Sequence, residues 1–220
     1  QAAVLKHQAD LGIALDGDGD RLIMVDQRGE LVDGDELLFI IARAQQRTGQ
    51  GNAEIVGTQM SNLGLEQALK QFDMTLHRSK VGDRYVIEKL KETGGIVGGE
   101  SSGHIICLDK TTTGDGIIAA LQVVAEMKGT GSSLHELHSV ITKYPQTLIN
   151  VKVDAITDLA ANDKITSAVE EVEKKLGSDG RVLLRPSGTE PVIRVMVEGR
   201  DATQTTRFAN DLADIIKENI

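Results

Sequence analysis

The feature that most constrains the fold of this chain is a regular alternation of short apolar runs and longer amphipathic stretches between residues 53 and 142. Strand-like runs lie near residues 53–57, 74–78 and 95–97, and helix-like stretches lie near residues 62–71, 83–92, 116–127 and 133–142. Strands that alternate with helices are typical of an α/β unit, in which helices connect the strands of a mostly parallel sheet. We therefore expect an α/β fold for this part of the chain.

A different order of elements follows Tyr144-Pro145, where we place a domain boundary. Strand patterns near residues 147–153, 181–184 and 192–197 and helix patterns near residues 163–176 and 202–219 give the order β-α-β-β-α. This order predicts a separate small α+β domain. At the other end of the chain, residues 27–29 separate two strand patterns as a hairpin turn would, and a helix is expected at residues 35–47.

An acidic loop, Asp16-Gly17-Asp18-Gly19-Asp20-Arg21, follows the apolar run 11–15, which we expect to be a short buried strand. Ligands of open α/β sheets bind at the carboxyl ends of such strands. Three carboxylates at alternate positions can converge on one hard divalent cation, and few protein ligands leave room for phosphate oxygens. We expect Mg²⁺ at Asp16, Asp18 and Asp20, with the Arg21 guanidinium beside the same phosphate.

Two other kinds of acidic loop compete with this prediction. An EF-hand loop requires glycine at its sixth position and a carboxylate at its twelfth, where this chain has Arg21 and Gln27. A haloacid-dehalogenase-type phosphatase also begins with Asp-x-Asp after a strand and would use Asp16 as its nucleophile. Such enzymes usually carry Thr or Val where this chain has Asp20. The first alternative fails on spacing, and the second remains a distant competitor.

A second loop, Gly98-Gly99-Glu100-Ser101-Ser102-Gly103-His104, lies between two strand-like runs. Its glycines allow the backbone to approach a ligand closely. Glu100, Ser102 and His104 offer an acceptor, a hydroxyl and a titratable ring, a combination that suits the neighbouring hydroxyls of a sugar. The alternative is an ordinary glycine-rich turn with an exposed glutamate and histidine.

A third loop, Arg185-Pro186-Ser187-Gly188-Thr189-Glu190-Pro191, also lies between two strand-like runs. Its prolines and glycine restrict its shape, so that backbone N–H groups and the hydroxyls of Ser187 and Thr189 can form a nest for an anion. Arg185 and Arg194 add positive charge. The sequence therefore predicts a phosphate cradle here, without a Walker motif.

Together, and in this order, the three loops resemble those of the α-D-phosphohexomutases, which interconvert 1-phospho and 6-phospho sugars. Three further segments are similar to the bacterial phosphoglucosamine mutase branch: Val-Gly-Thr-Gln-Met-Ser-Asn-Leu-Gly-Leu-Glu at 56–66, Lys-Val-Gly-Asp-Arg-Tyr-Val at 80–86 and Lys-Thr-Thr-Thr-Gly-Asp-Gly at 110–116. The resemblance spans nearly all of the chain. Ser101 stands where that branch more often has an amide side chain.

The resemblance implies reversible conversion of glucosamine 6-phosphate to glucosamine 1-phosphate through a bisphosphorylated intermediate, in the biosynthesis of amino sugars and cell-wall precursors. It implies that Arg21 braces the transferred group and that His104 relays a proton or contacts a phosphate. Phosphosugar contacts are implied for Lys80, Glu100, Ser102, His104, Arg185, Ser187, Gly188, Thr189 and Arg194. A glucose or mannose mutase is the nearest alternative within the family.

This family carries its phosphoryl group on a serine in a Ser-His-Asn-Pro segment of an earlier domain, and these 220 residues contain no such segment. We therefore expect a carboxy-terminal fragment: residues 1–32 as the tail of the second family domain, 33–143 as the third and 144–220 as the fourth. The missing domains of the same enzyme would be its partners. We expect the isolated chain to bind phosphosugar without turning it over.

The composition indicates a soluble, cytoplasmic protein. Hydrophobic residues make up 40% of the chain and aromatic residues only 2%, so its cores are expected to be aliphatic. A net charge of -9 argues against duplex nucleic acid or an anionic membrane as a partner. The single cysteine, Cys107, excludes a disulfide framework and is expected in the core. The remaining histidines, His7, His77, His135 and His138, lack motif context and are expected to be exposed or structural.

Overall fold

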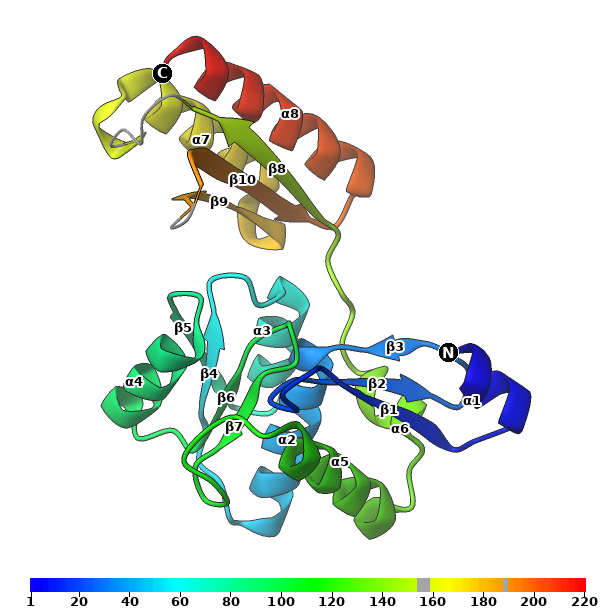
Figure 1. The fold of residues 1–220 in the computed structure, drawn as a ribbon. Helices are drawn as coiled ribbons and strands as arrows, with labels where there is room; N and C mark the ends of the chain where they lie inside the picture. The colour runs from blue at the N-terminus through cyan, green and yellow to red at the C-terminus, as the bar shows by residue number, and fades with distance from the viewer. Residues whose placement is uncertain (154–158, 188–189) are drawn as a thin grey trace. The chain divides into compact units, whose positions relative to one another are not determined.

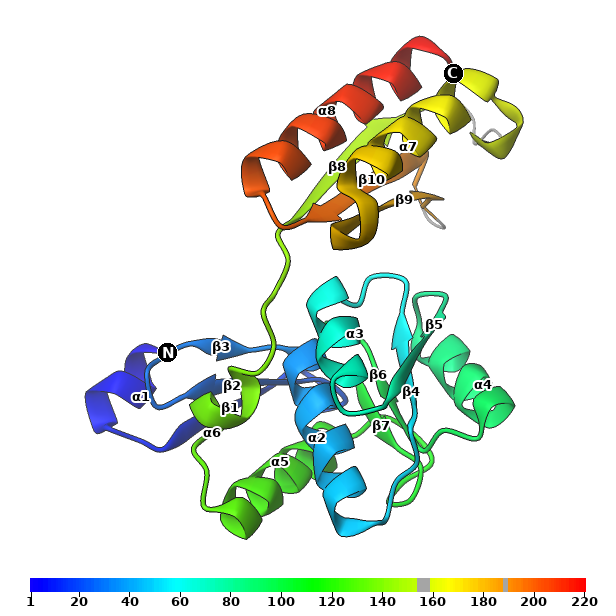
Figure 2. The same cartoon turned by 180° about the vertical axis from the view of Figure 1, so that it is seen from behind.

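The computed structural model describes residues 1–153, 159–187 and 190–220. The chain divides into two compact units, residues 1–143 and residues 144–220 (Figures 1 and 2). Each unit has a hydrophobic core of its own, and each is described by itself. Within these ranges, no helix has both the length and the apolar character that a membrane crossing requires.

The first unit begins with helix α1 (Ala2–His7) and a three-stranded antiparallel sheet in the order β1-β2-β3. Its strands are β1 (Leu11–Leu15), β2 (Leu22–Asp26) and β3 (Leu31–Val32). The hairpin predicted around residues 27–29 is confirmed, but the prediction that residues 11–15 are buried is wrong. β1 lies at the edge of this sheet, and Ile13 and Leu15 are 49% and 41% exposed. The acidic loop therefore connects two antiparallel strands instead of lying at the edge of a parallel sheet.

The rest of this unit is built on a four-stranded sheet in the order β5-β4-β6-β7. Strand β4 (Glu54–Thr58) is parallel to β5 (Thr75–Ser79) and β6 (Val97–Gly99), whereas β7 (Ile105–Cys107) is antiparallel to β6. One face is covered by α2 (Gly34–Thr48), α3 (Leu63–Lys70) and α5 (Gly116–Thr130), and the other by α4 (Asp83–Thr93) (Figures 1 and 2). This layered arrangement confirms the predicted α/β fold.

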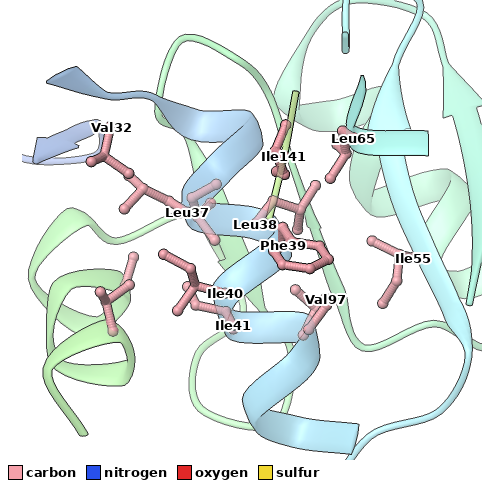
Figure 3. Packing of buried hydrophobic residues seen from close by; sticks show 14 of the residues in the cluster. Val32, Leu37, Leu38, Phe39, Ile40, Ile41, Ile55, Leu65, Val97 and Ile141 are labelled. Carbon is pink, nitrogen blue, oxygen red and sulfur yellow. The ribbon is translucent and has the colours of Figure 1, made fainter. Parts of the chain in front are cut away.

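The core of this unit lies between α2 and the sheet (Figure 3). Because side chains alternate along a strand, Ile55 packs into this cluster, whereas its neighbour Val56 packs with Val86 on the α4 side. Helix α2 is buried over its whole first half, so it can contact the sheet and α5 at once. Its fully buried side chains are Leu37, Leu38, Ile40 and Ile41. Cys107 is buried in the same cluster, as expected, and burial raises the pKa of its thiol to about 12.

Helix α6 (Leu134–His138) is shorter than the helix expected at residues 133–142. Ser133 caps it, since its hydroxyl accepts a hydrogen bond from the N–H of Glu136. Beyond the helix, Lys143 Nζ forms ion pairs with Asp33 at 2.9 Å and Glu36 at 2.7 Å, at the start of α2. These contacts hold residues 139–143 against α2 instead of continuing the helix.

The first turn of α4 also differs from expectation. Asp83 was expected to cap this helix, but Gly82 occupies the N-cap position with a φ of 126°, and Asp83 is the first helical residue. A left-handed conformation of this kind favours glycine, so the cap position follows from backbone geometry.

The second unit is a three-stranded antiparallel sheet in the order β8-β10-β9, with two helices packed on one face (Figures 1 and 2). Its strands are β8 (Gln146–Lys152), β9 (Gly180–Pro186) and β10 (Val192–Gly199), its helices are α7 (Asp163–Leu176) and α8 (Ala202–Glu218), and the short turns η1 (Leu159–Ala161) and η2 (Gly177–Asp179) flank α7. Helix α7 has the predicted bounds because Asn162 accepts hydrogen bonds from the N–H groups of Lys164 and Ile165. The predicted order β-α-β-β-α is confirmed.

Candidate functional site

The acidic loop between β1 and β2 brings three carboxylates together. One oxygen from each of Asp16, Asp18 and Asp20 lies within 4.8 Å of the others. The N–H groups of Gly19 and Arg21 donate to Asp16 Oδ1 at 3.2 and 3.3 Å and so close the loop. Desolvation raises the pKa of Asp16, but these N–H groups, a side-chain hydrogen bond with Asp20 and the Arg21 charge lower it overall. Asp16 is therefore held in its ionised form.

The donor set of this loop fits a hard divalent cation. Asp20 Oδ1 is buried and accepts no hydrogen bond from the described residues. Such an oxygen costs free energy unless an ion or a water satisfies it. Oxygen donors on a largely exposed loop suit Mg²⁺, which keeps water or phosphate among its ligands. Arg21 is 53% exposed, with its Nε 3.9 Å from Asp16 Oδ2, so its guanidinium lies beside the same position.

The glycine-rich loop at residues 98–104 packs directly against β2 and the start of α2. The N–H of Leu22 donates to Gly103 O at 3.0 Å, and the N–H of Gly34 donates to Ser101 O at 3.1 Å. Gly103 has a φ of 94°, and a Cβ there would lie 2.1 Å from Leu22 O. Only glycine fits this position, so the close approach fixes the glycine-rich loop next to the acidic loop.

His104 joins the two loops. Its Nδ1 lies 3.1 Å from Asp20 Oδ2, and the side chain is only 6% exposed. Its Nε2 is buried and has no hydrogen-bond partner in the part of the chain that the structure describes. Gly114 lies against the ring, since a Cβ at that position would be 2.1 Å from Nε2. The buried imidazole is therefore fixed in orientation, with one nitrogen on a predicted metal ligand.

Glu100 links the same loop to the segment that contains Lys80. Its Oε1 accepts a hydrogen bond from the N–H of Gly82 at 2.8 Å. Lys80 Nζ lies 5.8 Å from the centre of the Tyr85 ring. Lys80 and Glu100 thus belong to neighbouring segments, as the sequence predicts.

Ser102 is exposed on the other side of this loop. It lines a small cavity of about 250 Å³ together with residues of the acidic loop and its two strands, which are Ala14, Leu15, Asp16, Arg21 and Ile23. A hydroxyl, a carboxylate and a guanidinium therefore face one space, which suits a polar ligand with an anionic group.

The predicted phosphate cradle lies in the second unit, at the turn between β9 and β10. Arg185 and Arg194 are paired across these strands, and the Nε atoms of both are buried with no hydrogen-bond partner in the described ranges. Burial and the neighbouring charge of Arg194 lower the pKa of Arg185. The Ser187 N–H donates to Val192 O at 2.9 Å. Gly188 and Thr189 lie outside the described residues. Two adjacent guanidiniums of this kind provide charge for an anion.

Sequence reasoning missed Asp35, in the first turn of α2. Asp35 is 2% exposed, and its Oδ2 accepts a hydrogen bond from the N–H of Asn62 at 2.8 Å. Its Oδ1 has no partner among the residues described. Burial, together with the negative charge of Asp33, raises its pKa to about 7. The position lies inside an ordinary helical pattern, so no local signal marked it.

Comparisons with known proteins agree with the three loops. The model described as phosphoglucomutase/phosphomannomutase, alpha/beta/alpha domain III, matches residues 33–144, and the C-terminal domain model of the same name matches residues 148–215. The chain is 62% identical over 213 residues to phosphoglucosamine mutase of Nitrosococcus oceani and 57% identical over 218 residues to that of Citrobacter koseri. These alignments cover 97% and 99% of this chain but 47% and 49% of the relatives, so the chain spans about half the length of the curated relatives it matches.

Solved structures have the same fold. A phosphoglucomutase/phosphomannomutase family protein from Burkholderia thailandensis has a TM-score of 0.80 and 25% identity, over 99% of this chain and 48% of that protein. The N-acetylphosphoglucosamine mutase of Aspergillus fumigatus, solved with GlcNAc-6P and magnesium, has a TM-score of 0.78 and 18% identity, over 93% of this chain and 51% of that protein. The predicted resemblance to the phosphohexomutases is confirmed, and the chain belongs to the phosphoglucomutase/phosphomannomutase family.

Proposed function

We propose that this chain supplies the metal loop, the sugar loop and the phosphate cradle of a phosphoglucosamine mutase, which interconverts glucosamine 6-phosphate and glucosamine 1-phosphate. The observation that carries the proposal is the contact between Asp20 and His104, at 3.1 Å, because it joins the predicted metal loop to the predicted sugar loop. The identity of 57–62% to relatives of that name supports this branch over a glucose or mannose mutase. We also propose a cytoplasmic location, which suits a phosphosugar enzyme with one buried cysteine.

In this proposal, Asp16, Asp18 and Asp20 hold Mg²⁺. When bound, the ion neutralises charge on phosphoryl oxygens, which is the main requirement of phosphoryl transfer. Arg21 adds positive charge to the transferred group from the same loop. His104, fixed by Asp20 and Gly114, contacts a phosphate or relays a proton at Nε2.

The remaining groups bind and orient the substrate. Glu100 and Ser102 contact the sugar hydroxyls, and Lys80 contacts a phosphate. Binding energy from the phosphate that does not react aligns the one that does. The cradle that holds it consists of Arg185, Ser187, Gly188, Thr189 and Arg194.

The phosphoryl group itself belongs, in this proposal, to a serine in the domains that precede residue 1 in the full enzyme. Residues 1–32 are then the end of the second family domain, residues 33–143 the third and residues 144–220 the fourth. The isolated chain binds phosphosugar but does not convert it.

The test is steady-state kinetics of the full-length enzyme with glucosamine 6-phosphate and glucose 6-phosphate. We expect a higher kcat/KM for the glucosamine substrate, and a loss of about 100-fold or more in Arg185→Ala, because the substrate loses its alignment. Arg207→Ala, an exposed arginine on α8 of the same unit, is the matched control and should keep wild-type kinetics. A preference for glucose 6-phosphate would replace the proposed substrate, and unchanged kinetics in Arg185→Ala would remove the cradle from the mechanism.

Calorimetry of the isolated chain separates binding from turnover. We expect glucosamine 6-phosphate to release heat with the wild-type chain and none with Arg185→Ala. Conversion by the purified chain alone would contradict the assignment of the phosphoryl carrier to another domain.

A further inference from the structure

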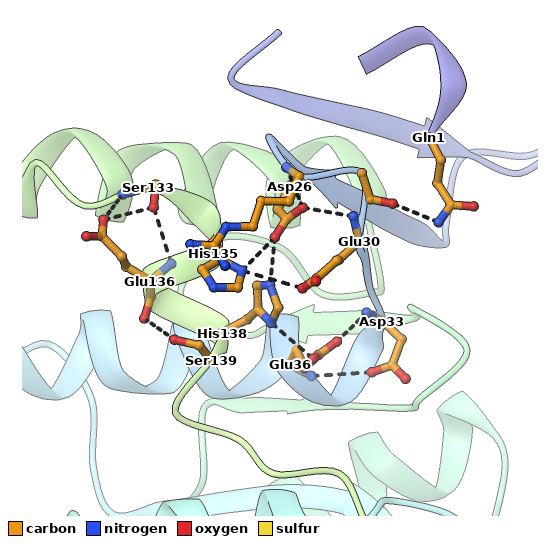
Figure 4. Close-up of polar contacts among 12 residues, drawn as sticks. Gln1, Asp26, Glu30, Asp33, Glu36, Ser133, His135, Glu136, His138 and Ser139 are labelled. Carbon is orange, nitrogen blue, oxygen red and sulfur yellow. Dashed lines mark hydrogen bonds and ion pairs between the residues drawn. The ribbon is translucent and has the colours of Figure 1, made fainter. Parts of the chain in front are cut away.

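A second group of side chains with metal-ligand chemistry lies at the other end of β2 from the acidic loop (Figure 4). Asp26 ends β2, Glu30 precedes β3, and His135 and His138 lie on α6. One nitrogen or oxygen atom from each lies within 4.8 Å of the other three. None of these residues has a role in the proposed mutase chemistry.

The four atoms are spaced as the ligands of one small ion would be. Asp26 Oδ2 lies 2.9 Å from His135 Nδ1 and 3.2 Å from His138 Nε2. Glu30 Oε2 lies 3.5 Å from His135 Nδ1. In a tetrahedral site with bonds of about 2.0–2.1 Å, neighbouring ligand atoms are roughly 3.3 Å apart. The observed separations bracket that value.

Contacts behind the ligands hold His138 in place. Its Nδ1 lies 3.2 Å from Glu36 Oε1, so the ring directs Nε2 towards Asp26. Glu36 in turn accepts a hydrogen bond from Lys143 Nζ at 2.7 Å. Histidines that bind metals commonly donate their other N–H group to a carboxylate, which fixes the ring and makes the ligand nitrogen more basic.

Asp26 is held just as firmly. Its side chain is fully buried, and its Oδ1 accepts hydrogen bonds from the N–H groups of Arg28 at 2.9 Å and Glu30 at 2.8 Å. Its Oδ2 therefore points at the two histidines. The exposed side of the group is formed by Glu30, which is 56% exposed and leaves a route for an ion from solvent.

We propose that Asp26, Glu30, His135 and His138 bind one Zn²⁺ ion in four-coordinate geometry. Two imidazole nitrogens and two carboxylate oxygens match the ligands that zinc prefers, and four protein ligands are typical of a structural site. Bound zinc would fasten α6 to the hairpin that begins with the acidic loop. The alternative is an ion-pair network in which a proton on His138 takes the place of the metal.

The test is a titration of the metal-free chain with Co²⁺ as a visible probe of Zn²⁺ sites, in excess Mg²⁺ to occupy the acidic loop. We expect one equivalent of Co²⁺ with the intense visible bands of tetrahedral coordination, which Zn²⁺ displaces, and a higher midpoint of thermal unfolding with Zn²⁺. Glu30→Gln and His135→Gln should each weaken Zn²⁺ affinity at least tenfold. Both positions are partly exposed, so both variants should fold, and the metal-free melting curve checks this.

His77→Gln and Asp18→Asn are the matched controls, because His77 contacts Glu54 elsewhere in this unit and Asp18 belongs to the acidic loop. Both should keep wild-type Zn²⁺ affinity. No Co²⁺ binding, or binding that is lost in Asp18→Asn but kept in His135→Gln, would overturn the proposal in favour of the metal-free ion-pair network.

Discussion

The two ends of β2 present carboxylates in opposite environments. At one end, Asp16 and Asp18 are exposed and lie close to a third carboxylate, with Arg21 as a partly exposed counter-charge. At the other end, Asp26 is fully buried and contacts two imidazoles and two backbone N–H groups. The comparison teaches that the same side chain serves a ligand where the fold leaves it unneutralised and serves stability where the fold neutralises it.

The largest expected effect is at the buried end. Asp26→Ala should lower the free energy of unfolding of the first unit by about 3–5 kcal/mol, because it leaves a buried ionic network without its central charge. Asp18→Ala, at the exposed end, should change it by no more than about 0.5 kcal/mol. Calorimetric unfolding at pH 7 in the presence of a chelator measures both. Equal effects would break the comparison.

Asp35 sharpens the comparison, because it is buried without a counter-charge at its Oδ1. Its pKa of about 7 in the folded chain lies above the 3.8 of an unperturbed aspartate, so unfolding releases a proton between these pH values. Stability should therefore fall as pH rises from about 4 to 7, and the loss should remain above pH 7. A shift of about 3 pKa units corresponds to at most about 4 kcal/mol.

Asp35→Asn removes this titration and keeps an oxygen that can accept the hydrogen bond from Asn62 N–H. We expect the variant to be more stable than the wild type at pH 8 and to differ little from it at pH 4. Urea unfolding across this pH range measures the difference, with the exposed Asp10→Asn as the control. Parallel curves for the wild type and Asp35→Asn would show that Asp35 is ionised in both states.

A smaller effect is expected where the two loops meet. Gly103→Ala should cost about 1–3 kcal/mol, because Gly103 has a positive φ and a Cβ there would lie 2.1 Å from Leu22 O. Gly17→Ala is the matched control, since no atom lies within 4 Å of its Cβ position. Thermal unfolding and Mg²⁺ titration of both variants measure the result. Wild-type stability in Gly103→Ala would mean that the loops tolerate separation.

The smallest expected effect on stability is at the exposed carboxylates. Asp18→Asn should change the free energy of unfolding by less than about 0.5 kcal/mol without a metal, since its side chain is exposed. In the wild type, Mg²⁺ should raise the unfolding midpoint, because it binds the folded loop. In Asp18→Asn this increase should disappear. An equal Mg²⁺ response in both chains would place the ion elsewhere.

Most elements of the fold could be predicted from sequence because their signals are local. Helix α7 has its predicted bounds, as Asn162 and Gly177 mark its ends within the chain itself. Helix α6 ended early because Lys143 pairs with residues at the start of α2, which are far away in sequence. The apolar run of β1 predicted a strand correctly, but its burial depended on which elements cover it, and no pattern within the run contains that information.

The same division holds for the candidate sites. By itself, the sequence determined the order of elements and the identity of three loops, because each loop holds its candidate ligands within a few residues and its backbone can bring them together. Only the tertiary structure decided that His104 contacts Asp20 and that Asp26 contacts His135 and His138, which lie 84, 109 and 112 residues apart. Long-range contacts of this kind depend on how β2, α2 and α6 pack, and that packing is set by buried side chains throughout the first unit.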